Sequence, residues 1–574
     1  MITIWRRLQI SVGEATSNRL MEGVLIFIFV GSILAAEGQP FSPPLSNPLL
    51  LSGNFAEPRK SHFHAGLDMR TLEREGLPIR AAADGYVSRV NISPYGYGNA
   101  LYITHPNGLT TVYGHLSGFN KVITAAIREQ QYARESFAVD LFFKPGELPV
   151  KQGEQVALSG NTGGSGGPHL HFEIRDSLER PHNPMLYGYV PNDHIAPTIN
   201  AVQLYALGAS QLNTKPYRLA PVKGQWPKTT IALNADEVGI AVNTFDRMDQ
   251  TPASFGVYHM VLWVDGKKQF EYRADTLSFA MMRQIISEVD YPVFLREHNR
   301  SFHRLFLLPN NRLPLYPVAV NRGIINLSDG MPHLCKITVR DFAGNTSSLS
   351  LTLQKQQEAT TFKRLAVPET LLRCASDNTF EDGSWRYQIP GNSLSDSIFV
   401  HRSSAIDSGR LVVQLGQPTN HLQDYARIGI NIAKLPASLQ QKALIVWKDE
   451  RGKWISKGGT IENGKLTAKI RELGFFSWRI DTIAPTVTNI NFAEGRSYQK
   501  NQMIRFRASD SLSGLGRFRT LIDGHWELTE LDGKSGVLTI LTNRLAAGMH
   551  QLELTVADER GNETIIRGSF SLTD

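Results

Sequence analysis

The sequence contains very little cysteine: its 574 residues include only two, Cys335 and Cys374. Two thiols are too few for a disulfide scaffold, and they lack the paired spacing of a thiolate zinc site. We therefore expect neither cysteine to bind a catalytic metal. The sequence does not decide whether they form a disulfide or stay buried as free thiols.

A hydrophobic run long enough to span a membrane is also missing, since a spanning helix needs about 20 apolar residues. The apolar stretch 24–36 is shorter, follows three arginines and ends in the small residues Ala35 and Ala36. This pattern predicts a signal peptide over residues 1–36. We expect export to the periplasm, the cell envelope or the extracellular space, with no stable membrane span once the signal is removed.

The sequence also lacks any segment in which charge of one sign is concentrated. The net charge is +7, from 60 Lys and Arg against 53 Asp and Glu, and no long basic run collects it. Nucleic acid is therefore not indicated as a partner. A mildly basic surface fits simple solubility and leaves open an attraction to an anionic envelope polymer.

Length and composition predict several folded domains. The chain exceeds what one hydrophobic core usually serves, and 41% apolar with 20% charged residues is typical of globular proteins. After a Pro/Ser-rich linker at 37–47, short β-like runs separated by Gly-containing turns predict a β-rich domain over residues 48–192. The expected fold class is mainly all-β.

A repeat organises the rest of the chain. The sequence Asp-His-Ile-Ala-Pro-Thr at 193–198 recurs as Asp-Thr-Ile-Ala-Pro-Thr at 481–486, and both modules end near an Asp-x-x-Gly-Asn motif. We predict related β-sandwiches at 193–355 and 481–574, with an insertion at about 277–332 in the first and a small β-domain at 356–480. They resemble the immunoglobulin-like modules of exported bacterial proteins, which would give envelope proteins a surface to bind.

Histidine gathers in the first third of the chain, in the patterns His64-x-x-x-Asp68 and His169-x-His171. Residues two apart on a strand share one face, so both histidines of the second pattern can face one site. A catalytic zinc needs three N or O ligands and an open position for water, and His64, Asp68 and His171 supply them. His115 and His169 are then free to act as general base and as oxyanion donor, and the sequence does not decide which residue takes which role.

Single histidines are more often structural than catalytic. His105, in a Pro-Asn-Gly turn, and His182, close to a proline, keep the structural interpretation. His62 has Gly66, not a carboxylate, four residues later.

The fragments become specific as an ordered set. Tyr-Gly-His at 113–115, Gly-Tyr-Gly-Asn at 96–99, the Gly-rich segment 153–163 and Gly-Pro-His-Leu-His-Phe-Glu at 167–173 accompany the first pattern. Together they resemble the lysostaphin-type, or LytM-domain, zinc peptidases over about residues 48–180. One departure is visible: residues 120–148 are longer than the usual connection.

The resemblance implies a LytM-type β-sheet domain, a duplicated hybrid motif, with one zinc per chain. It implies that His64, Asp68 and His171 bind the metal and that His115 and His169 are catalytic. No motif position is substituted, unlike in degenerate members that act only as regulators.

The expected function is that of a secreted zinc metalloendopeptidase acting on peptidoglycan stem-peptide cross-links, with water as the nucleophile. Two alternatives remain: a non-hydrolytic activator of cell-wall amidases, and a surface adhesion or scaffold protein built on the β-sandwich modules.

Overall fold

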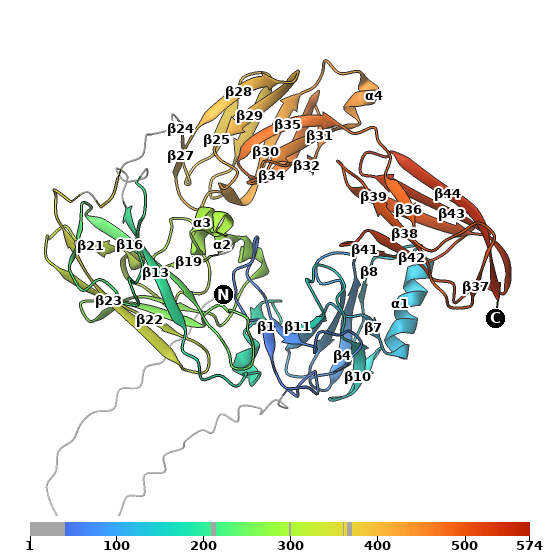
Figure 1. Ribbon diagram of the computed structural model, residues 1–574, viewed down its shortest axis with the longest axis horizontal. Coiled ribbons are helices and arrows are strands. Elements are labelled where there is room, and N and C mark those ends of the chain that lie inside the picture. Colours follow the sequence, from blue (N-terminus) through green and yellow to red (C-terminus); the bar gives the residue numbers. More distant parts are fainter. Residues whose placement is uncertain (1–40, 208–213, 298–299, 360, 364–369, 574) are drawn as a thin grey trace, which may run out of the picture. The chain divides into compact units, whose positions relative to one another are not determined.

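The computed structural model describes residues 41–207, 214–297, 300–359, 361–363 and 370–573 (Figure 1). The expected signal peptide, 1–36, and the first part of the expected linker lie outside the described residues. Within the described ranges, no helix is long and apolar enough to cross a membrane.

Strands far outnumber helices among the described residues, which confirms the expected all-β fold class. The N-terminal region, residues 41–192, contains a single α-helix among its strands. Its elements are β1 (Leu51–Gly53), β2 (Leu67–Arg70), β3 (Pro78–Arg80), β4 (Gly85–Ile92), β5 (Asn99–Thr104), β6 (Thr110–Gly114), β7 (Gly118–Phe119), α1 (Lys121–Ala133), β8 (Val139–Phe142), β9 (Pro149–Val150), β10 (Gln155–Leu158), β11 (His169–Arg175), β12 (Pro181–His182) and the 3-10 helix η1 (Pro184–Tyr187).

A nine-stranded antiparallel sheet forms the centre of this region, in the order β1-β2-β11-β6-β5-β4-β8, with β12 beside β11 and β9 beside β4. A smaller sheet of three strands runs β3-β10-β7. Along β11, Leu170, Phe172 and Ile174 are fully buried in the core. Because side chains alternate along a strand, His169 and His171 point to the opposite face.

The long connection at 120–148 forms α1 and the edge strand β8. Asn120 caps α1, since its side chain accepts a hydrogen bond from the Ile123 backbone N–H at 3.0 Å. Ile123 and Ile127 are buried on the inner face of the helix, which packs on β7 and β8 (Figure 1). The extra residues thus extend the main sheet and leave the strands that carry the predicted site residues unchanged.

The first module, residues 193–355, contains two sheets, in the orders β14-β13-β16-β19 and β15-β23-β22-β17-β18-β20, with β21 beside β16. The expected insertion holds its short helices. The elements are β13 (Thr198–Leu207), β14 (Tyr217–Leu219), β15 (Ile231–Leu233), β16 (Glu237–Phe245), β17 (His259–Val264), β18 (Lys267–Arg273), η3 (Phe279–Gln284), α2 (Ile285–Glu288), α3 (Tyr291–Arg296), β19 (Phe302–Arg304), β20 (Val318–Ala319), η4 (Val320–Gly323), β21 (Ile325–Asn326), β22 (His333–Arg340) and β23 (Thr346–Lys355).

The middle domain, residues 370–480, has two five-stranded sheets around one apolar core. Their orders are β25-β26-β30-β34-β33 and β28-β29-β35-β31-β32, and β24 pairs with β27. The elements are β24 (Thr370–Leu372), β25 (Asn378–Glu381), β26 (Trp385–Ile389), β27 (Ile398–Val400), β28 (Arg402–Asp407), β29 (Arg410–Leu415), β30 (His421–Asn431), α4 (Ala437–Gln440), β31 (Ala443–Lys448), β32 (Trp454–Gly458), β33 (Thr460–Glu462), β34 (Lys465–Glu472) and β35 (Gly474–Ile480).

The C-terminal module, residues 481–573, also places two sheets on one core, in the orders β36-β38-β42-β41 and β37-β44-β43-β39-β40. Its elements are β36 (Thr486–Asn489), β37 (Arg496–Gln499), β38 (Ile504–Ser509), β39 (Leu515–Ile522), β40 (His525–Trp526), β41 (Thr529–Asp532), β42 (Val537–Ile540), β43 (Gly548–Asp558) and β44 (Glu563–Thr573). Contacts between residues join Phe41–Asp574 into one compact unit.

The two cysteines are free and buried in different places. Cys335 lies on β22, and burial raises the pKa of its thiol to about 12. Cys374 follows β24 in the middle domain. The question that the sequence left open is therefore settled in favour of unpaired thiols.

Two loops of the N-terminal region pack closely against each other at Gly98 and Gly163. Gly163 has a φ of +68°, and a Cβ built there would lie 2.3 Å from the Gly98 backbone nitrogen. The contact holds the loop after β10 against the turn before β5. It also places the Thr162 carbonyl 2.8 Å from Nδ1 of His115.

We expect Gly163→Ala to destabilise the protein more than Gly153→Ala. Gly153 also has a positive φ, +79°, but a Cβ there meets nothing within 4 Å. Gly153→Ala should cost about 1 kcal/mol through backbone strain alone, and Gly163→Ala about 1–3 kcal/mol more through the clash. Denaturant unfolding of both variants measures the difference. Equal unfolding free energies would show that the loop contact contributes nothing.

Candidate metal centre

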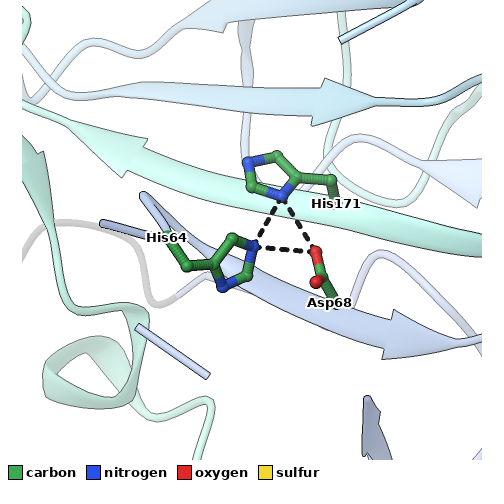
Figure 2. Close-up of side chains that lie close together, drawn as sticks. All are labelled: His64, Asp68 and His171. Carbon is green, nitrogen blue, oxygen red and sulfur yellow. Dashed lines mark hydrogen bonds and ion pairs between the residues drawn. The ribbon is translucent and has the colours of Figure 1, made fainter. Parts of the chain in front are cut away.

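Strand pairing brings the predicted ligands together. In the antiparallel pair β2–β11, Asp68 lies directly opposite His171. His64 sits four residues before Asp68, in the segment that leads into β2. Figure 2 shows the three side chains pointing toward one another from these two places in the chain.

The three ligand atoms converge on one point. His64 Nε2 lies 2.9 Å from Asp68 Oδ1 and 3.0 Å from His171 Nδ1, and His171 Nδ1 lies 2.9 Å from Asp68 Oδ1. A tetrahedral ion with bonds of about 2.0–2.1 Å holds its ligand atoms about 3.3–3.4 Å apart. The observed triangle is slightly tighter, so small side-chain movements would admit such an ion.

Hydrogen bonds behind the site fix which ring nitrogen faces it. His64 Nδ1 donates to the Asn54 carbonyl at 2.7 Å, which leaves Nε2 as the free lone pair. His171 Nε2 donates to Glu173 Oε1 at 2.8 Å, so Nδ1 is the ring nitrogen that faces Asp68 and His64. A metal ligand usually has its other ring N–H fixed in this way, so the arrangement favours metal binding.

Glu173 anchors this outer layer. It is completely buried, and it accepts hydrogen bonds from Arg175 Nε at 2.7 Å and from the Tyr97 hydroxyl at 2.5 Å. Burial alone would raise the pKa of this carboxyl, but Arg175 and His171 outweigh burial and lower the pKa to about 2. The carboxylate therefore stays charged and can hold His171 in place.

Asp68 is also oriented from outside. Its Oδ2 accepts a hydrogen bond from Arg59 Nη2 at 3.2 Å, while Oδ1 faces the two histidines. Burial would raise the pKa of Asp68, but the surrounding histidines, above all His64, keep the pKa well below its usual value. The ligand set is thus two imidazoles and one ionised carboxylate, which suits a zinc-like cation.

His169 and His115 lie beside the ligand triangle. His169 Nδ1 donates to the Gly167 carbonyl at 2.8 Å, and its Nε2 lies 3.3 Å from Asp68 Oδ1. The His115 ring is centred 4.8 Å from that of His169 and 5.8 Å from that of His171. The structure therefore gathers all five predicted site residues.

His115 is held as a neutral imidazole. Burial, and then the charges of His171 and His169, lower its pKa to about 3. Nδ1 donates to the Thr162 carbonyl, so Nε2 carries a free lone pair. His115 follows β6 directly and has a left-handed backbone with φ of +61°, which turns the chain out of the sheet at this point.

The histidines that we expected to be structural lie outside the site. His105 is buried and bonded through Nδ1 to the Asp84 carbonyl at 2.9 Å and through Nε2 to Thr111 Oγ1 at 2.8 Å. His182 contacts Asp176, and His62 is exposed. Sequence reasoning gave no role to Glu173 or Asn54. The alternation His-x-His-x-Glu along β11 could have suggested the first, but nothing in the sequence marks the second.

Family comparisons agree with this geometry. Residues 62–133 match the model described as peptidase family M23, and residues 369–481 match a Zu5-like domain. The chain therefore contains a peptidase M23 domain, the LytM type that the motifs resemble. The matched M23 segment ends before His169 and His171. Pairing of β11 with β2 and β6 brings these two histidines next to the matched segment.

Particular relatives share this part of the chain. The DD-carboxypeptidase/endopeptidase Mpg of Neisseria meningitidis is 35% identical over 123 residues, 21% of this chain and 22% of that protein. The peptidoglycan DD-endopeptidase ShyA of Vibrio cholerae is 31% identical over 138 residues, 23% of this chain and 26% of that protein. A zinc-containing peptidase from Vibrio cholerae, known from its crystal structure, is 29% identical, with a TM-score of 0.20, over 26% of this chain and 40% of that one. The match spans about a fifth of the first of these relatives.

We expect Glu173→Gln to weaken metal binding about 10–100-fold, because removing the charge loosens and weakens His171 as a ligand. Titration of metal-free protein with a fluorescent chelator as competitor measures the affinity. Glu179→Gln is the matched control, since Glu179 also pairs with Arg175, at 3.0 Å, but is exposed. The same loss in both variants would assign the effect to Arg175 and not to support of His171.

Proposed function

We propose that the protein is an exported zinc metalloendopeptidase that hydrolyses peptide cross-links of peptidoglycan. The observation that carries the proposal is the convergence of His64, Asp68 and His171, with two further histidines beside them. A site that only stored metal would not need the additional imidazoles. Zinc is the proposed metal because the donor set of two nitrogens and one carboxylate oxygen leaves a fourth position open.

A zinc ion bound there would supply Lewis acidity, which polarises the scissile carbonyl and makes a nearby water acidic at neutral pH. His115, neutral and with Nε2 free, can accept the water proton. His169 in its protonated form, with Nδ1 held by the Gly167 carbonyl, can donate a hydrogen bond through Nε2 to the oxyanion that develops on the carbonyl oxygen. The rings of the two histidines are centred 4.8 Å apart, close enough to exchange these tasks.

The substrate class is proposed from the relatives. Mpg is named a DD-carboxypeptidase/endopeptidase and ShyA a peptidoglycan DD-endopeptidase. We propose stem-peptide cross-links as the substrate of this chain and the cell envelope as its place of action. Export through the predicted signal peptide, and the immunoglobulin-like character of the two β-sandwich modules, stay predictions.

We expect the purified protein to carry about one zinc per chain and to release soluble muropeptides from peptidoglycan. His64→Ala and His171→Ala should lose both properties, because each removes a ligand. His115→Ala and His169→Ala should keep zinc and lose about 10²–10⁴-fold in rate, because each removes a proton-handling group. Metal analysis and mass spectrometry of the digest measure these outcomes.

The same experiment tests the alternatives. Full zinc content without hydrolysis of any peptidoglycan preparation would favour a non-hydrolytic activator of amidases. Turnover that persists after complete zinc removal would contradict the mechanism. His105→Ala is a suitable control, because it changes a buried histidine outside the metal centre.

The C-terminal module contacts loop 161–165, which carries the Thr162 carbonyl bonded to His115 Nδ1. Lys534 Nζ donates to the Ser165 carbonyl at 3.2 Å and to the Asn161 carbonyl. Arg128 of α1 pairs with Glu530 at 2.8 Å, next to a hydrogen bond from Tyr132 to Glu527. These contacts favour a role for the module as a cover over loop 161–165, with substrate delivery as the alternative.

We expect Lys534→Ala to raise the initial rate of peptidoglycan hydrolysis. Losing hydrogen bonds worth about 1 kcal/mol would shift the closed-to-open equilibrium about fivefold. Arg567→Ala is the control, since it removes a positive charge that pairs with Glu553 within the same module. Measuring soluble fragment release over time compares the variants. A slower Lys534→Ala enzyme would favour substrate delivery.

A further inference from the structure

Three aspartates of the first module meet in a place separate from the metal centre. Asp246 follows β16, Asp341 follows β22, and Asp193 precedes β13, so the three come from distant parts of the sequence. One carboxylate oxygen from each lies within 4.8 Å of the others. Three negative charges so close together repel one another unless a proton or a cation neutralises them.

Asp246 is the member with a carboxylate oxygen that lacks a hydrogen-bond partner. Its side chain is 1% exposed, and its Oδ1 is buried without a hydrogen bond in the described part of the chain. Burial and the charges of Asp341 and Asp193 raise its pKa to about 8. A buried carboxylate oxygen without a donor is costly, so its presence here indicates a missing ligand.

Hydrogen bonds orient the other two carboxylates. Asp341 Oδ1 accepts hydrogen bonds from the backbone N–H groups of Gly344 at 2.7 Å and Asn345 at 2.9 Å, and Oδ2 accepts one from Asn345 Nδ2 at 2.8 Å. Asp193 Oδ1 accepts one from the Ile195 N–H at 3.0 Å. These contacts orient the carboxylates and leave their remaining lone pairs free for a ligand.

A cavity of about 20 Å³ lies at the cluster. All three aspartates line it, together with Asn54, Gly256 and Tyr258 among others. This is room for one water-sized particle, since about 10–15 Å³ is enough for one. The cavity is therefore large enough for a single ion and too small for an organic ligand.

We propose that Asp193, Asp246 and Asp341 bind a calcium ion between the first module and the N-terminal region. The donors are all oxygens, which suits a hard cation rather than zinc or copper. Oxygens around one calcium ion, at about 2.3–2.6 Å from it, lie at most about 5 Å apart, in agreement with the observed cluster. Water molecules would complete the coordination shell.

The ion would fasten a segment that reaches the catalytic metal centre. Asp246 and Phe255 exchange two backbone hydrogen bonds of 2.9 Å, which closes loop 246–255. The next residue, Gly256, accepts from Asn54 Nδ2 at 2.7 Å and donates to Asn54 Oδ1 at 3.1 Å. The Asn54 carbonyl in turn accepts from His64 Nδ1. Calcium would thus hold in place Asn54, whose backbone carbonyl fixes the tautomer of His64.

The repeat provides an internal comparison. Asp481, Asp510 and Asp558 form the matching cluster in the C-terminal module. There Asp510 is partly exposed, and its Oδ2 accepts from the backbone N–H groups of Leu512 at 2.9 Å and Gly514 at 2.7 Å. This second cluster has no buried carboxylate without a partner like that of Asp246, so it carries no proposal and supplies a control.

Calcium binding is tested on the zinc-loaded protein after treatment with EGTA and removal of the chelator. Titration calorimetry with CaCl₂ should show a site that Asp246→Asn removes and Asp510→Asn retains. Asp193→Asn should weaken the same site in a variant that keeps the buried carboxylate. Mg²⁺, which is smaller and gives up its waters reluctantly, should bind at least about tenfold more weakly. Wild-type protein that binds no calcium, or binds Mg²⁺ equally well, overturns the proposal.

Thermal unfolding separates a cation site from a merely structural carboxylate. Calcium should raise the melting temperature of the wild type by at least about 2 °C and leave that of Asp246→Asn unchanged. In EGTA, Asp246→Asn should melt no lower than the wild type, because the amide replaces a buried carboxyl group whose Oδ1 has no hydrogen-bond partner. An Asp246→Asn variant that is less stable both with and without calcium would overturn the assignment.

Discussion

The antiparallel pairing of β11 with β2 on one side and β6 on the other is the constraint on which the site depends. The pairing places His171 opposite Asp68 and Gly114, one residue before His115. Because side chains alternate along a strand, the same register buries Leu170 and Phe172 in the core. A shift by one residue would exchange the two faces and destroy core and metal centre together.

Around this register, the outer hydrogen bonds decide what the imidazoles can do. Asn54 and Glu173 each take the ring proton that faces away from the centre, and the Thr162 carbonyl does the same for His115. A metal ligand and a proton acceptor both require a free lone pair on the ring nitrogen that faces the site. A hydrogen bond to the other ring nitrogen provides this in both cases. The buried charge of Glu173 is tolerated because Arg175 and Tyr97 satisfy it.

The domains beyond residue 192 contribute through contacts with the N-terminal region. Asn54 is shared between the metal centre and Gly256 of the first module, and Lys534 of the C-terminal module binds the carbonyls of the loop near His115. Asn54 accepts a hydrogen bond from His64, and the loop that Lys534 binds includes the Thr162 carbonyl, which accepts one from His115. Hydrogen bonds thus connect both modules to the surroundings of the predicted site.

The sequence by itself determined the mainly-β fold class and, through ordered motifs, predicted five histidine and aspartate site residues that the structure places close together. Motif spacing carries that information because alternation on a strand is local. Only the tertiary structure decided the roles of Asn54 and Glu173, the free state of the cysteines, and the meeting of Asp193, Asp246 and Asp341. These depend on contacts between residues far apart in the chain, and a single sequence contains no local signal for such contacts.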